Sequence, residues 1–157
     1  MLIGSRSSCV TARGRVEAIR ALRIPADSRE HCSLLFLAPS AVALSDALGG
    51  GLLDDAYYGA VGPDCYCLYL DEERLTKRLE LNHRAAVMAA RLGWENRSTC
   101  LAGDALLVGA DSRRNDVDVP ASVITAAWRG GLIEQPEEPT DLSAPRSLQA
   151  FDAPAHR

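Results

Sequence analysis

The chain has 157 residues, of which 47% are hydrophobic and only 5% aromatic, and its formal net charge at pH 7 is -4. This length fits one domain, and the scarcity of aromatic side chains means that its core must be aliphatic. The negative charge argues against a general nucleic-acid binder, because such a protein needs a basic excess to displace counterions from phosphates.

The apolar runs, such as residues 34–38, are far too short to span a bilayer, so we expect no membrane association. Residues 1–11 lack the basic stretch followed by an apolar stretch that marks a secretory signal. The cysteine count is odd, which indicates reduced thiols; the five are Cys9, Cys32, Cys65, Cys67 and Cys100. We therefore expect a cytoplasmic protein.

Composition divides the chain into three parts. Residues 1–14 are rich in Ser, Gly and Arg and predict a flexible N-terminus. Residues 134–157 have few large apolar side chains and hold four of the eight prolines, which predicts a disordered Pro-rich tail. A single α+β domain over residues 15–133 lies between them.

The first half of that domain shows several short elements. Residues 15–25 alternate in a way that fits a strand or a short helix, and the apolar run 32–37 predicts a buried strand. Ser40 is placed to cap a helix that the glycines at 49–51 end. Residues 52–58 predict an exposed strand.

The second half carries clearer patterns. Residues 65–70 alternate as a strand, with Cys65, Cys67 and Tyr69 on one face and Tyr66, Leu68 and Leu70 on the other. Residues 81–92 have helical spacing, which puts Leu81, Ala85, Met88, Ala89 and Leu92 on one face. A strand at 105–108 and a turn at 112–115 predict a hairpin, and Pro120 begins a last helix. The fold class we predict is α+β, with a small, mostly antiparallel sheet and two or three helices packed on one face.

The pair Cys65 and Cys67 raises the question of a metal. Together with His31, Cys32, His83 or Cys100 these thiols could form a site. Structural zinc sites show two closely spaced ligand pairs, however, and here only one pair exists. We therefore expect no metal and no cofactor, and interpret the two thiols as small core side chains.

The segment around residue 82 is the most basic stretch of this acidic chain, and we take it as the candidate ligand site. Asn82 is placed to cap a helix, and helix N-termini attract anions. Basic groups and the upstream tyrosines could grip a nucleotide by phosphate contact and stacking; the predicted set is Asn82, His83, Arg84, Lys77, Arg78, Tyr57 and Tyr58. The commoner alternative is a solvated helix face with core tyrosines. No catalytic residue is predicted, because His83 has no evident partner.

Three segments resemble a known family. They are the Leu-Gly-Gly-Gly-Leu stop at 48–52, the strand 67–71 that leads into Leu-x-x-x-Leu-x-Leu-Asn-His-Arg-Ala-Ala at 75–86, and Leu-Ala-Gly-Asp-Ala-Leu-Leu-Val-Gly at 101–109. Together they resemble a family of phages, plasmids and actinobacterial genomes catalogued as domain of unknown function 3846. The resemblance covers roughly residues 19–127, with departures at the longer ends and at 106–107. It implies a fold and a mobile-element setting, and it carries over no catalytic residues.

That setting favours a small protein that binds a target and blocks it. We therefore expect a non-enzymatic binding protein, a counter-defence factor that sequesters either a nucleotide signal or a host protein. Self-association into a homo-oligomer is compatible with this interpretation. One alternative is a small hydrolase acting on a nucleotide through His83 or the acidic runs at 54–55 and 71–73. The other is an antirestriction protein that presents acidic surface in place of DNA.

Overall fold

A computed structural model describes residues 17–94 and 99–135. The elements in chain order are β1 (Ile19–Ile24), β2 (Ser33–Leu37), α1 (Ala41–Ala47), β3 (Leu53–Val61), β4 (Asp64–Asp71), α2 (His83–Arg91), β5 (Ala105–Ala110), β6 (Asp116–Val117) and α3 (Ala121–Arg129). The predicted flexible N-terminus at 1–14, and the predicted tail from 136 onward, lie outside the described residues.

The strands form one sheet in the order β2-β1-β5-β4-β3, and β6 pairs with β5 beyond that path. Every pair of neighbouring strands is antiparallel. With three helices added, this confirms the α+β class predicted from the sequence. None of the described helices has the length and apolar character needed to cross a bilayer.

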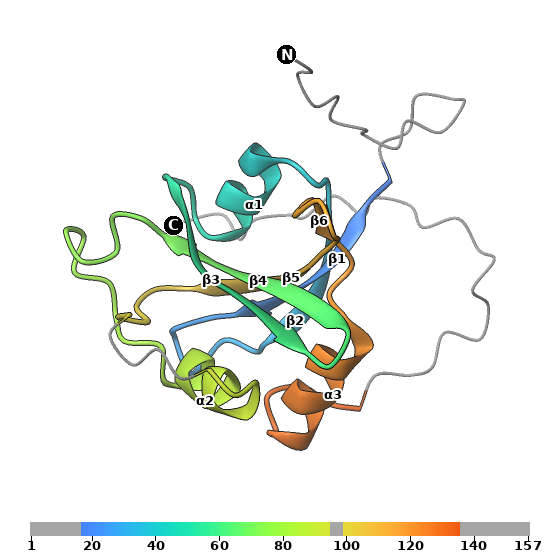
Figure 1. The fold of residues 1–157 in the computed structure, drawn as a ribbon. Coiled ribbons are helices and arrows are strands. Elements are labelled where there is room, and N and C mark those ends of the chain that lie inside the picture. The colour runs from blue at the N-terminus through green and yellow to red at the C-terminus, as the bar shows by residue number, and fades with distance from the viewer. Residues whose placement is uncertain (1–16, 95–98, 136–157) are drawn as a thin grey trace, which may run out of the picture.

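Helices cover both faces of the sheet (Figure 1). On what we call the α2/α3 face, Met88 of α2 and Val123 of α3 pack against the sheet residues Leu22, Leu68 and Leu107. On the opposite, α1 face, the helix residues Leu44, Ala47 and Leu48 pack against Ile19, Ala21, Leu106 and Val108. Two helices thus share one face, as predicted, and the third covers the other.

The alternation predicted for strand 65–70 is confirmed in β4. Tyr66, Leu68 and Leu70 belong to the core on the α2/α3 face. Cys67 is buried in the core on the α1 face, and Tyr69 packs against it. Successive side chains of a strand point to opposite faces, so one short segment contributes to both cores.

The predicted helix boundaries depend on local bonds, and two of them are confirmed. The Ser40 side chain accepts a hydrogen bond from the Ala43 N–H, and the Asn82 side chain accepts one from the Ala85 N–H. The glycines after α1 adopt φ values of 91°, 89° and 102° at Gly49, Gly50 and Gly51, in the region where a side chain is strained. These three residues turn the chain from α1 into β3.

Two sequence expectations need correction. The run 32–37 is not a fully buried strand, because β2 lies at the edge of the sheet and Phe36 remains 36% exposed. Helix α2 begins at His83, so Leu81 lies outside it, pairs with Ala102 in an isolated bridge and is 54% exposed. Because Leu81 continues the apolar spacing, the predicted helix began one residue before Asn82, which caps the N-terminus of α2.

Candidate functional site

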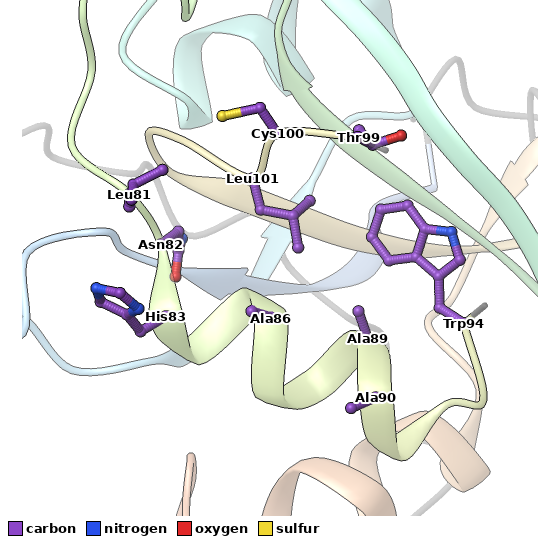
Figure 2. Close-up of a pocket in the computed structure, with 10 residues that line it drawn as sticks. All are labelled: Leu81, Asn82, His83, Ala86, Ala89, Ala90, Trp94, Thr99, Cys100 and Leu101. Carbon is purple, nitrogen blue, oxygen red and sulfur yellow. The ribbon is translucent and has the colours of Figure 1, made fainter. Parts of the chain in front are cut away.

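A groove of about 510 Å³ runs along α2, between this helix and the segment 99–101 (Figure 2). The residues that line it are Leu81, Asn82, His83, Ala86, Ala89, Ala90, Trp94, Thr99, Cys100 and Leu101. Trp94 and Thr99 lie at one end, and Leu81 and His83 at the other. The volume falls within the usual range of small-molecule sites.

Small side chains on α2 keep the groove open. Met88 and Ala85 are buried in the core beneath the helix. On the groove side the helix carries Ala86, Ala89 and Ala90, and in Figure 2 Ala89 points toward Leu101 across the gap. A longer side chain at these alanine positions would occupy the space of the groove.

The opposite wall is fixed by a buried arginine. The Arg74 side chain is largely covered, and the residue as a whole is 8% exposed. Its Nε donates to the Cys100 carbonyl oxygen at 2.8 Å, and its Nη1 pairs with the Asp54 carboxylate at 2.7 Å. Arg74 therefore ties the segment 99–101 to the start of β3 and holds this wall of the groove in place.

Trp94 closes one end of the groove. Its ring stacks on Tyr57 with 4.4 Å between ring centroids and an interplanar angle of 29°. Tyr57 in turn lies 5.9 Å from the ring of Tyr66, which is buried. The indole Nε1 is buried and finds no hydrogen-bond partner among the residues that the structure describes. The tryptophan is thus held by a row of aromatic rings while a strong donor remains unused.

Asn82 anchors the other end. It is 1% exposed, and its amide nitrogen donates to the carbonyl oxygens of Ile24 at 2.8 Å and Gly103 at 3.0 Å. Its Oδ1 caps α2 through the Ala85 N–H at 2.9 Å. These bonds join α2 to the end of β1 and to the segment just before β5, so Asn82 shapes the site and has its side-chain groups engaged within the fold. His83, the next residue, is exposed and lines the groove.

Two of the predicted basic residues are engaged with groups of the protein itself. The Arg84 guanidinium donates to three carbonyl oxygens of the loop after β1, those of Pro25, Asp27 and Glu30, at 2.6–2.7 Å. Lys77 pairs with the Asp71 carboxylate at 2.7 Å, and this bond raises the pKa of the lysine. The Lys77 charge is therefore paired with a carboxylate, and the Arg84 guanidinium is committed to backbone carbonyls. Arg78 is exposed and adopts a φ of 54°.

The two predicted tyrosines do not share a surface. Tyr57 of β3 pairs with Leu68 of β4 and lies on the α2/α3 face, where it supports Trp94. Tyr58 pairs with Cys67 on the α1 face, and its ring lies 4.2 Å below the Arg114 guanidinium carbon. Adjacent strand residues point to opposite faces, so of these two tyrosines Tyr57 lies on the side of the groove, although it does not line it.

The thiols are also separated. Cys32 packs in the core of the α2/α3 face and Cys67 in that of the α1 face, so the sheet lies between them. Cys100 lines the groove, but in Figure 2 its sulfur points away from α2. Within residues 17–94 and 99–135, no three His, Cys, Asp or Glu side chains gather closely enough to hold a metal ion.

Sequence reasoning found Asn82 and His83 but missed the rest of the groove. Trp94, Leu101 and Cys100 come together only because the segment 99–101 returns beside α2. The one sequence signal was the repeated alanine pair of α2, at residues 85–86 and 89–90, followed by Gly93 and Trp94. Such a stripe of small residues on a helix leaves room for a neighbour or a ligand.

Comparison with known proteins gives a likeness of fold alone. No family model matches the chain, and no curated protein matches it. The structure is similar to part of the crystal structure of the small RNA methyltransferase HEN1, with a TM-score of 0.52 and 18% sequence identity. The aligned region covers 73% of this chain but only 16% of that one. At this identity the match supports the α+β architecture and is silent on activity.

Proposed function

We propose that the chain is a non-enzymatic binding protein that sequesters a small molecule with a flat aromatic group and an anionic group, such as a nucleotide, in the groove along α2. The observation that carries this proposal is the composition of the groove's two ends. An indole held by Tyr57 stands at one end, and the N-terminus of a helix stands at the other.

The Trp94 end suits an aromatic group. Tyr57 backs the indole, so little side-chain entropy remains to be lost when a base stacks nearby. Stacking of a base on an aromatic side chain contributes about 1–3 kcal/mol and tolerates any base. In Figure 2 the six-membered ring of the indole is the part nearer Leu101, so the groove meets the apolar edge of Trp94.

The α2 N-terminus suits an anion. The first N–H groups of a helix lack partners within the helix and carry partial positive charge. The exposed His83 imidazole lines the groove beside them. Nine helical residues rise over roughly 14 Å, a span that fits a nucleotide with its base at Trp94 and its phosphate at His83. Because Arg84 and Lys77 are bonded within the fold, we assign the phosphate contacts to the helix end rather than to these two side chains.

The biological setting comes from the resemblance to domain of unknown function 3846. It supports a cytoplasmic counter-defence factor that removes a nucleotide signal from solution, with a host protein as the alternative occupant of the same groove. A DNA mimic is less favoured, because Asp54 and Asp71 of the acidic runs are paired with Arg74 and Lys77. The small-hydrolase alternative would act through His83 or the acidic runs, and in those runs Asp54 and Asp71 already pair with Arg74 and Lys77.

Binding in the groove can be followed by the fluorescence of Trp94. The chain has two tryptophans, Trp94 and Trp128, and Trp128→Phe leaves the groove indole as the sole tryptophan fluorophore. In that background we would titrate adenosine monophosphate and a cyclic dinucleotide. We expect quenching that saturates with at least one of these probes. The groove-filling Ala86→Leu variant should bind it at least about tenfold more weakly.

The matched control is Val87→Leu, one residue further along α2, which is exposed and does not line the groove. It should bind as the parent does. Equal binding by the Ala86→Leu variant and the parent would refute the proposed site. Recovery of the bound nucleotide unchanged after denaturation supports sequestration, whereas recovery of a cleaved product would establish the hydrolase alternative.

A further inference from the structure

We propose that two copies of this chain pair through the open edge of β2, with their two-fold axis at Leu35, to form one continuous antiparallel sheet. Strand β2 lies at one edge of the sheet and pairs with β1 on one side only. Among the described residues, nothing is hydrogen-bonded to its other side.

The backbone of β1 fixes which groups of β2 face outward. Arg20 uses both its backbone groups on the β5 side, since its N–H donates to the Asp118 carboxylate at 2.8 Å and its C=O accepts from the Val119 N–H at 2.7 Å. In the pairing of β1 with β2, Phe36 lies opposite Arg20, so these two residues form a non-hydrogen-bonded pair. The N–H and C=O of Phe36 therefore point away from β1. By the alternation of antiparallel pairs the same holds for Leu34, opposite Leu22.

A second copy satisfies these four groups in one register. With the two-fold axis at Leu35, Leu34 of each copy lies opposite Phe36 of the other, and each such pair exchanges two hydrogen bonds. Leu35 then meets Leu35 of the partner subunit as a non-hydrogen-bonded pair. All four outward groups of each strand are used, and the contact is isologous, as a closed dimer requires.

The side chains of β2 also fit a copy of themselves. The strand reads Ser-Leu-Leu-Phe-Leu, with no charge and no proline. In the two-fold register Glu30 and His31 lie opposite the partner's Ser40 and the partner's Pro39, so no like charges meet. Phe36 remains 36% exposed and would pack on the partner's Leu34.

The opposite edge of the sheet shows the contrast. Strand β3 carries Asp54 and Asp55, and its register with β4 is interrupted between Asp55 and Tyr57. Charges and bulges of this kind discourage edge-to-edge pairing. Within the described sheet, β2 is thus the edge open to a partner, while β3 is protected.

The test combines mass and cross-linking on the full chain. Sedimentation equilibrium over a concentration series should give a mass that rises toward twice the 16.8 kDa of one chain. Leu35→Cys places two thiols at the two-fold axis, where Cα atoms of a non-hydrogen-bonded pair approach to about 4.5 Å and a disulfide can form. Ser33→Cys is the matched control, because that residue lies opposite the partner's Leu37. Its cross-linking should not exceed that of the parent, and mass spectrometry of the linked peptides separates products joined at the substituted position from those of the native thiols.

Phe36→Pro provides the complementary test, since it removes an N–H that β1 does not use. It should leave the circular dichroism spectrum unchanged and give a monomer, whereas Asp55→Lys on the β3 edge should still dimerise. The amides of Leu34 and Phe36 should be protected from hydrogen exchange in the parent at high concentration. A parent that is monomeric throughout the series, or Leu35→Cys cross-linking no better than Ser33→Cys, would overturn the proposal. Protected amides in a monomer would also overturn it, and would show that another part of the same chain covers β2.

Discussion

Replacement of Asn82 by Ala should destabilise the protein far more than loss of an ordinary helix cap. A capping side chain contributes about 1 kcal/mol. Asn82 also donates to the Ile24 and Gly103 carbonyls in a site where it is 1% exposed. Each of these bonds contributes roughly 1 kcal/mol net, and more if the carbonyl is left buried without a partner. The free energy of unfolding should therefore fall by about 3 kcal/mol.

The comparison that isolates this effect is Ser40→Ala. Ser40 caps α1 through one exposed bond of 3.2 Å to the Ala43 N–H, so its loss should cost about 0.5–1 kcal/mol. Urea unfolding of both variants, followed by circular dichroism, gives the two free energies from midpoints and slopes. If Asn82→Ala cost no more than Ser40→Ala, then Asn82 would be only a cap, and our description of it as the link between α2, β1 and β5 would fail.

Three other predictions concern buried or paired groups. Arg84→Ala should lower the free energy of unfolding by about 1.5–3 kcal/mol in the same urea assay, because three carbonyls lose a charged donor; a fully stable variant would contradict this. Hydrogen bonds from Arg29 lower the pKa of the Asp27 carboxyl to about 2. The ionised Asp27 carboxylate therefore stabilises the fold above the pKa that this residue has in the unfolded chain, and this contribution is lost as the pH falls from about 4 toward 2. Asp27→Asn should flatten that part of a urea-midpoint profile, and an unchanged profile would count against the pairing. Burial raises the pKa of the Cys67 thiol to about 12, so iodoacetamide at mildly alkaline pH should modify the partly exposed Cys100 and spare Cys67 in peptide mapping.

The sequence predicted what depends on near neighbours. The alternation of residues 65–70 identifies β4 and its two faces, because strand periodicity is local. Ser40 and Asn82 were recognisable as caps because each bonds to an N–H three residues on. The glycines after α1 were recognisable as a helix stop because the positive φ that they adopt is a local property of glycine.

What depends on distant contacts could not be predicted. The two carbonyls that Asn82 binds lie 58 and 21 residues away, and those of Arg84 lie 54–59 residues away. In the sequence both residues therefore look like exposed polar groups beside a helix N-terminus. The groove was missed because an alanine on a helix fits a core face and an open wall equally well; only the return of segment 99–101 distinguishes them. The edge position of β2 is likewise a property of strand order.

The central claim is that the groove along α2 captures a small aromatic anion without altering it. The most direct measurement is mass spectrometry of the compounds that the full chain retains from a cell extract and releases on denaturation. We expect a compound with an aromatic ring and a phosphate, retained equally by the parent and Val87→Leu and lost with Ala86→Leu. Retention of nothing beyond what Ala86→Leu also retains would contradict the claim.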